Sequence, residues 1–202
     1  MNLVLSLDME DPIGFIDEFG SFEYVKAGHV LLSNGRKVLN ELARRGLRVI
    51  VDLKFADIPS IVSKAIKSWD HEAVIGFTVH SCAGIDSVKA ALEATDKMVF
   101  AVVKLTSMVG DLKDYEAIID QLNALGSDFV LPGRWAISLK GKINGKILTP
   151  GIRMEVSNQD QMDVVKLEEV RDVVDFAVLG REVYMSCDPK DKMKKIREMI
   201  GA

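Results

Sequence analysis

Residues 48–69 read RVIVDLKFADIPSIVSKAIKSW, and this stretch decides the fold. Its first part, Arg48–Leu53, is a mainly apolar run of the kind found in strands that are buried on both faces of a parallel sheet. Its second part, Pro59–Trp69, has the periodicity of an amphipathic helix. The stretch therefore predicts one strand–helix unit with a polar turn between its two elements.

The same alternation continues along the whole chain. Apolar runs predict further strands at Leu3–Leu7, Tyr24–Ala27, Val74–Val79, Val99–Leu105, Phe129–Leu131, Lys146–Leu148 and Phe176–Leu179. Helices are expected at Asp11–Phe19, Val30–Arg45, Asp86–Ala94, Lys113–Leu125, Trp135–Lys140, Gln159–Val170 and Pro189–Ile200. Gly46 is a suitable C-cap for the helix that precedes it. Strands that alternate with helices through short connections predict a parallel sheet covered by helices.

We expect this α/β sheet to close into a (β/α)8 TIM barrel. An open doubly wound sheet would typically carry a GxGxxG turn after its first strand, and residues 5–12, LSLDMEDP, contain no such turn. The length of 202 residues fits one barrel domain, 1–202, near the lower size limit of this fold.

Composition and charge argue against several classes of partner. The net charge is −4, and no stripe of Lys and Arg with interleaved aromatic residues indicates nucleic-acid binding. The first residues lack a basic segment and reach Asp8 too early for a signal peptide, and no apolar run has the ~18 residues of a membrane helix. We expect a cytoplasmic protein with no membrane partner. Cys82 and Cys187 lack metal-ligand spacing, and we expect both thiols to be buried or half-buried.

Ionisable and small polar residues gather where the predicted strands end. In barrels of this kind the chemistry takes place at the C-terminal ends of the strands. The residues at these ends are Asp8, Lys26, Asp52, Lys54, Asp57, His80, Ser107, Pro150, Gly151, Arg153, Gly180 and Arg181. So many polar ends on one rim indicate a functional site.

Asp52 and Lys54 form the densest part of this pattern. They are two residues apart, so on a strand both side chains point the same way, into the mouth of the barrel. Charges held there must neutralise each other, because an unpaired buried charge is costly. A salt bridge that only closes the barrel is one interpretation, but Asp8 and Lys26 on the two preceding strands favour an active site.

The last two strands end in a pattern that favours phosphate. Gly180 can bring a backbone N–H close to an oxyanion, and Arg181 can supply a bidentate guanidinium. Pro150, Gly151 and Arg153 follow the preceding strand. Loops after strands seven and eight are the usual phosphate site of these barrels, so we expect a phosphorylated ligand.

Taken together, these motifs resemble the orotidine 5′-phosphate decarboxylase family in its short archaeal form. The matching pattern covers nearly the whole chain: Asp8 … Lys26 … Asp52-x-Lys54-x-x-Asp57-Ile58-Pro59 … Ser107 … Pro150-Gly151-Ile152 … Gly180-Arg181. The resemblance implies decarboxylation of orotidine 5′-monophosphate to uridine 5′-monophosphate (UMP) and CO2, the last step of de novo UMP biosynthesis. It also implies that no metal or organic cofactor takes part.

The resemblance further implies a role for each matching residue. Lys54 would protonate C6 of the pyrimidine, and Asp52 would lie against the substrate carboxylate. Lys26, Asp52, Lys54 and Asp57 would form an alternating charged network, in which Asp57 reaches the site of a neighbouring subunit in a homodimer. The binding contacts would be Asp8 and Lys26 to the ribose, Ser107 and Ile58 to the pyrimidine, and Gly180 and Arg181 to the phosphate.

The chain departs from the family pattern at two places. The family commonly has Thr four residues after the last Asp of the motif, whereas this chain has Ile61. The family's phosphate-binding glutamine matches Gln161 better than Gln159.

Two other interpretations are open. A Mg2+-dependent sugar-phosphate lyase of the same superfamily shares the DxKxxD motif, but it carries a Glu in place of Lys26 and a small residue in place of Ile58. A catalytically silent barrel that binds phosphorylated ligands should have lost the lysine or one of the aspartates, and this chain retains them all.

Overall fold

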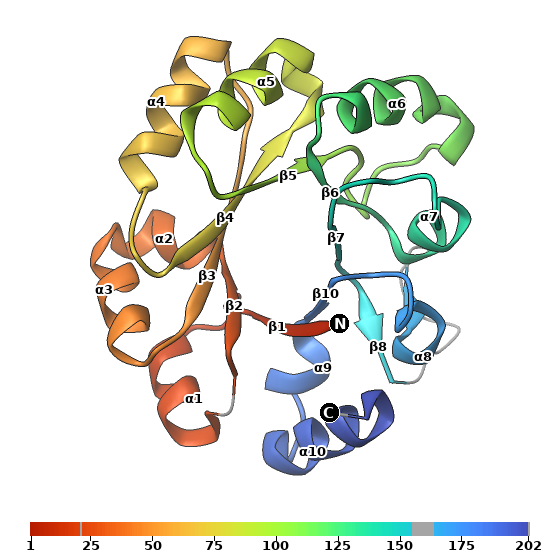
Figure 1. Ribbon diagram of the computed structural model, residues 1–202. Helices are drawn as coiled ribbons and strands as arrows, with labels where there is room; N and C mark the ends of the chain where they lie inside the picture. The colour runs from red at the N-terminus through yellow and green to blue at the C-terminus, as the bar shows by residue number, and fades with distance from the viewer. Residues whose placement is uncertain (21, 155–163, 202) are drawn as a thin grey trace.

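A computed structural model describes residues 1–20, 22–154 and 164–201 of the chain. Eight parallel strands close into a barrel in the order β1-β10-β7-β6-β5-β4-β3-β2. They are β1 (Asn2–Ser6), β2 (Tyr24–Ala27), β3 (Arg48–Phe55), β4 (Val74–His80), β5 (Met98–Val102), β6 (Asp128–Val130), β7 (Ile147–Thr149) and β10 (Phe176–Leu179). Figure 1 shows the helices arranged as a ring around these strands. The predicted (β/α)8 barrel is therefore confirmed.

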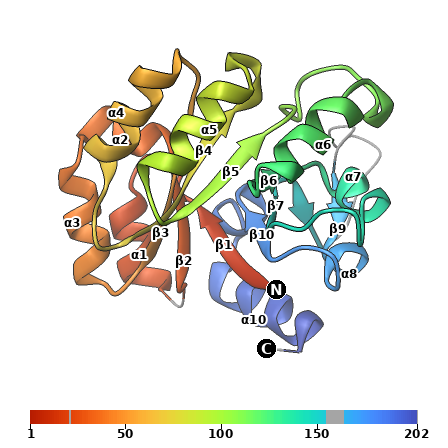
Figure 2. The ribbon, with the colours of Figure 1, turned by 45° about the horizontal axis from the view of Figure 1, so that its top comes forward.

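The helices follow the strands, and several bounds match the predicted ones. They are α1 (Pro12–Phe19), α2 (His29–Asn34), α3 (Lys37–Arg44), α4 (Pro59–Trp69), α5 (Ile85–Ala94), α6 (Glu116–Ala124), α7 (Gly133–Ser138), α8 (Leu167–Val170), α9 (Arg181–Tyr184) and α10 (Pro189–Ile200). Figure 2 shows α1–α5 on one side of the barrel and α6–α8 on the other. Pro59 and Pro189 begin their helices, where the missing N–H removes no helical bond.

Two helix predictions were wrong. The segment Val30–Arg45 forms two helices rather than one, because Gly35 adopts a left-handed φ of 66° and ends α2. The segment Gln159–Val170 contributes only the short α8, since Val165–Lys166 forms strand β9, which pairs with β8 (Ile152–Arg153). Residues 159–163 of that prediction lie outside the described residues.

The Gly46 cap was predicted correctly. Gly46 has a φ of 71°, and the N–H groups of Gly46 and Leu47 donate to the carbonyls of Ala43 and Leu42. This pair of bonds is the Schellman arrangement, and it satisfies carbonyls at the end of α3.

The core has two parts, one inside the barrel and one outside it. The inner cluster contains Val4, Ile50, Phe100, Val102, Val130, Leu148, Phe176 and Val178. The larger outer cluster lies between the strands and the helices and includes the alternate strand residues, such as Leu5 and Val51. Side chains from alternate positions therefore fill the barrel, which leaves the C-terminal rim as the place for a site.

Two expectations from the sequence concern the cysteines and a membrane helix. Cys82 and Cys187 are both exposed, so the prediction of buried or half-buried thiols was wrong. Cys82 lies in the turn that follows β4, and Cys187 lies in the connection between α9 and α10. Connecting segments of this kind run over the protein surface. Among the described residues, no helix is both long and apolar enough to cross a membrane.

Candidate active site

The carboxylate of Asp52 is the centre of the rim cluster. Its side chain is only 6% exposed, and the Lys26 ammonium donates to its Oδ2 atom. The Lys54 ammonium lies 2.9 Å from Oδ1, and the Thr78 hydroxyl donates to the same oxygen at 3.0 Å. A buried carboxylate that accepts from two ammonium groups and a hydroxyl is well satisfied, so the expected Asp/Lys pairing is confirmed.

The backbone around Lys54 departs from a regular strand. The pairing of β3 with β4 shifts register between Val51 and Phe55, and Lys54 has a φ of 46°. No other described non-glycine residue has a positive φ. The Lys54 N–H donates to the Thr78 hydroxyl at 2.9 Å, so Thr78 holds both this backbone and Asp52. Bulges and strained backbone of this kind gather at functional sites.

Asp52 also depends on a close backbone contact that spacing does not reveal. A Cβ atom at Gly28 would lie 2.8 Å from the Asp52 carbonyl oxygen. Gly28 follows β2 and precedes α2, so only a residue without a side chain lets this turn pack against β3.

The charges of the cluster determine its protonation states. Burial by itself would raise the pKa of Asp52, but the ammonium groups of Lys26 and Lys54 outweigh it and keep that pKa below its ordinary value. Burial lowers the pKa of His80, and the nearby Lys54 charge lowers it further. At neutral pH Asp52 is therefore ionised and His80 is neutral.

Asp8 extends the cluster toward the first strand. Its Oδ2 atom lies 4.0 Å from the Lys26 ammonium and accepts a hydrogen bond from the Ser6 hydroxyl. The Asp8 side chain is half-exposed, unlike that of Asp52. Lys26 thus lies between a buried and an accessible carboxylate.

Two adjoining cavities open at this rim. The first, here called the Lys54 cavity, has a volume of about 260 Å³ and is lined by Lys26, Asp52, Lys54, Val102, Lys104, Leu105, Thr106, Ser107, Val130, Leu148, Pro150 and Val178. The second, the Arg181 cavity, has a volume of about 250 Å³ and is lined by Ser6, Asp8, Lys26, Thr106, Pro150, Gly151, Ile152, Arg153, Val164, Val178, Gly180, Arg181, Glu182 and Tyr184. Lys26, Thr106, Pro150 and Val178 line both, so one elongated molecule can occupy the two together.

The Arg181 cavity brings together the residues predicted to bind phosphate. Gly151 has a φ of 74°, which a side chain would disfavour, and its turn carries Arg153 to the cavity wall. Arg181 is exposed, and Arg153 is part-buried with its Nη1 atom 3.6 Å from Glu182 Oε2. Two guanidinium groups beside two glycines can bind a phosphate group.

Other predicted site residues are not in these cavities. Asp57 and Ile58 are exposed, and the Asp57 carboxylate accepts from the Ile58 N–H at 2.7 Å. Within the described part of a single chain, Asp57 forms no salt bridge, so the expected four-residue network has three members here. Gln159 and Gln161 lie outside the described residues.

Several residues of the site were missed from the sequence. Thr78 lies within an apolar strand, and its partner Asp52 is 26 residues away, so no local pattern indicated the contact. Lys104 is buried, with its ammonium 5.3 Å from the centre of the Trp135 ring. Lys104 interrupts the apolar run before Ser107, and a charged residue in such a run could have indicated a residue of the site. Glu182 and Tyr184 lie one and three residues after Arg181.

The arrangement allows proton transfer next to a charged cavity. Lys54 can donate a proton to a ligand atom, and Asp52 holds its ammonium in place. The described residues contain no group of three or more His, Cys, Asp or Glu side chains that could hold a metal ion. The fold and the site together define a (β/α)8-barrel enzyme with a charged site at the C-terminal ends of its strands.

Comparison with known proteins identifies the family within this class. The model of the Orotidine 5′-phosphate decarboxylase / HUMPS family matches residues 1–196, and the chain belongs to this family. It is 65% identical to the orotidine 5′-phosphate decarboxylase of Thermotoga maritima over 98% of this chain and 99% of that one.

Solved structures agree with this assignment. The crystal structure of the Thermotoga maritima decarboxylase matches with a TM-score of 0.91 and 62% identity over 98% of both chains. The decarboxylase of Methanocaldococcus jannaschii, complexed with the inhibitor BMP, matches with a TM-score of 0.78 and 26% identity over 100% of this chain and 99% of that one.

Proposed function

We propose that the two cavities hold orotidine 5′-monophosphate and that Lys54 supplies the proton that replaces its carboxylate. The observation that carries this mechanism is the Lys54 ammonium, held 2.9 Å from the buried Asp52 carboxylate at the wall of the Lys54 cavity. The decarboxylase activity itself follows from membership of the family and from the 65% identity to a decarboxylase across the full chain. The chain is accordingly a carboxy-lyase of UMP biosynthesis.

The reaction breaks the bond between C6 and the carboxylate carbon. Carbon dioxide leaves, the electron pair stays at C6, and a proton from the Lys54 ammonium forms the new C–H bond. A fixed ammonium stabilises the negative charge that develops at C6 and needs no reorganisation when the charge appears. Lys26 and Lys54 keep Asp52 ionised, so a substrate carboxylate placed beside it is repelled, whereas the carbanion beside Lys54 is stabilised.

The rest of the substrate would extend along the shared wall into the Arg181 cavity. Asp8 and Lys26 would hold the ribose hydroxyls, and Ser107 would contact the pyrimidine ring. Gly151, Gly180, Arg153 and Arg181 would bind the phosphate, because they line the Arg181 cavity and not the Lys54 cavity. Binding energy from a group remote from the reacting carbon can be used to orient the ring and exclude water.

We also propose a homodimer in which Asp57 completes the site of the other subunit. Asp57 is exposed, and Ile58 next to it is 62% exposed, although isoleucine is among the residue types most often buried. Ile61, in place of the family threonine, is exposed on the same turn. An apolar rim around an acidic residue fits a partner surface that offers a cation, and Lys54 is that cation in this proposal. We propose separately that the protein is located in the cytoplasm.

The test is turnover by the purified protein. Loss of orotate absorbance, with UMP and CO2 as the products, is expected on addition of orotidine 5′-monophosphate. The rate should be unchanged after exhaustive treatment with EDTA. Turnover of a keto-sugar phosphate that needs added Mg2+, without decarboxylation of the nucleotide, would support the sugar-phosphate lyase instead. Binding of the nucleotide without turnover would support a silent barrel.

A further inference from the structure

The Arg181 cavity contains a carboxylate that an anion site does not need. Glu182 lines this cavity beside Arg153, Gly180 and Arg181, and its side chain is only 11% exposed. A carboxylate near a bound phosphate repels it, and the repulsion is strong where water is scarce. The position of Glu182 therefore calls for a role that offsets this repulsion.

The contacts of Glu182 indicate that role. Its Oε1 atom lies 2.5 Å from the Lys192 ammonium of α10, and its Oε2 atom lies 3.6 Å from Nη1 of Arg153 on β8. The contact between Glu182 and Arg153 is an ion pair rather than a hydrogen bond, because 3.6 Å is too long for a hydrogen bond. One carboxylate thus connects the loop after β7 with the helices that follow β10, and each of its oxygens has its own cation.

We propose that Glu182 is a positioning residue that holds the Arg153 guanidinium at the phosphate end of the cavity. An arginine side chain has many rotamers, and an arginine fixed before binding loses less freedom when the ligand arrives. Lys192 balances the other carboxylate oxygen, so Glu182 orients Arg153 without presenting a full negative charge to the phosphate. This inference rests on the proposed phosphate site.

The experiment compares Glu182→Gln with the unaltered enzyme. Glutamine keeps the size of the side chain and removes the charge. We expect KM for orotidine 5′-monophosphate to rise about tenfold, while kcat stays within about twofold, because the chemistry at Lys54 is unchanged. Inhibition by UMP should weaken by the same factor as KM. Inhibition by uridine, which lacks the phosphate, should not change.

A matched control and a double variant test whether Glu182 acts on phosphate binding through Arg153. Glu198→Gln removes a glutamate charge from the exposed face of α10, where Glu198 lies 4.0 Å from Lys194, and should leave KM unaltered. Arg153→Ala should weaken UMP binding more than Glu182→Gln does. In the Arg153→Ala background, Glu182→Gln should have no further effect, since the residue through which it acts is gone.

Each other result would overturn the inference in a distinct way. Tighter UMP binding by Glu182→Gln would make Glu182 a source of repulsion, and an equal loss for UMP and uridine would make it merely structural. An effect that persists in the Arg153→Ala background would separate Glu182 from Arg153. If Arg153→Ala left UMP binding unaltered, the proposed phosphate contact of Arg153 would fail as well.

A second substitution applies if Glu182→Gln does not fold. Lys192→Gln leaves the Glu182 carboxylate without its balancing cation and should weaken UMP binding while uridine binding stays the same. Unchanged or tighter UMP binding in this variant would contradict the balancing role of Lys192 and overturn the inference.

Discussion

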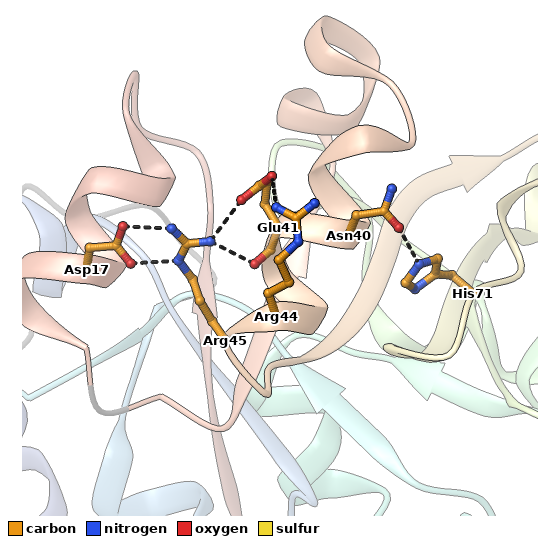
Figure 3. Close-up of polar contacts among 6 residues, drawn as sticks. All are labelled: Asp17, Asn40, Glu41, Arg44, Arg45 and His71. Atoms are coloured by element: carbon orange, nitrogen blue, oxygen red, sulfur yellow. Dashed lines mark hydrogen bonds and ion pairs between the residues drawn. The ribbon is translucent and has the colours of Figure 1, made fainter.

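Two ion networks at opposite ends of the barrel use the same chemistry in different surroundings. At the end where the strands begin, Arg45 binds Asp17 through Nε at 2.6 Å and Nη2 at 2.7 Å, and it also binds Glu41 at 3.1 Å (Figure 3). At the C-terminal rim, Asp52 accepts from Lys26 and Lys54. The Asp17 side chain is 54% exposed and that of Asp52 is 6% exposed.

The difference in exposure determines what each network can do. Water and salt screen the Arg45 network, and exposed ion pairs of this kind contribute little to stability. The Asp52 carboxylate at the centre of the rim network is out of water, where removal of one partner leaves a charge uncompensated and where a fixed ammonium acts strongly on a ligand. Good geometry is common to both, so burial rather than geometry distinguishes a site from a surface contact.

Removal of Lys54 should give the largest effect. We expect Lys54→Ala to lower kcat by more than about a thousandfold, because the proposed proton donor and the charge that stabilises the carbanion are both lost. Lys194→Ala, at an exposed lysine of α10, is the control and should be fully active. Steady-state turnover measures both variants. Activity of Lys54→Ala within about tenfold of the parent, or ~1.4 kcal/mol in the barrier, would remove Lys54 from the mechanism.

Mixed subunits should recover part of this loss. Asp57→Asn and Lys54→Ala are each expected to be nearly inactive. Random pairing of equal amounts gives half heterodimers, and each of these has one site with both substitutions and one with neither. About a quarter of all sites should then be unaltered, by the two-fold symmetry. Activity that stays at the level of the separate variants after confirmed subunit exchange would place Asp57 in its own subunit's site.

Thr78→Val should lower both stability and turnover, by less than the loss expected for Lys54→Ala. We expect this effect because Thr78 belongs to the buried rim network. The substitution removes the hydroxyl that contacts Asp52 and the Lys54 N–H, so we expect a loss of about 1–3 kcal/mol in unfolding free energy. It should also lower kcat about tenfold, because Lys54 is less well positioned. Thr149→Val is the control, since this buried hydroxyl has no hydrogen-bond partner among the described residues. Denaturant unfolding and turnover measure the two effects, and equal behaviour of the two variants would contradict the role of Thr78.

His80 reports on the charge of the rim network through its titration. Its pKa lies below 6.5 because of burial and then of Lys54, so NMR should find a higher pKa for His80 in Lys54→Ala. The unfolded chain takes up this proton near pH 6.5 and the folded chain only at lower pH. Stability should therefore fall as pH drops below 6.5, and this slope should flatten in His80→Gln. An unaltered His80 titration in Lys54→Ala would show that the two groups do not interact.

Asp17→Asn should have the smallest effect. Arg45 holds the pKa of Asp17 below its ordinary value of 3.8, so the pair stabilises the fold above that pH and is lost as pH falls through the folded-state pKa. We expect the unfolding midpoint at pH 7 to fall by no more than about 3 °C, and the difference to vanish in 1 M salt. A calorimetric loss as large as that of Thr78→Val would end the distinction between the two networks.

The helix and strand predictions succeeded where the signal is local. The first and last residues of β2, α4, β10 and α10 were predicted correctly, because each has an apolar run or a helical periodicity bounded by Gly or Pro. The helix across Val30–Arg45 failed at Gly35, where the apolar periodicity continued through a break in the backbone. Both halves of that segment pack against the barrel, so the hydrophobic pattern did not mark the break.

The sequence by itself determined the barrel and the set of charges on its rim. Strand ends of a parallel barrel meet at one face, and residues two apart on a strand point the same way, so Asp52 and Lys54 could be placed together from their spacing. Only the tertiary structure decided which groups hold them: Thr78 and Gly28 contact Asp52 across 26 and 24 residues of chain, and Glu182 on α9 meets Arg153 on β8. Such partners are set by strand register and helix packing, which depend on the whole chain and leave no local pattern.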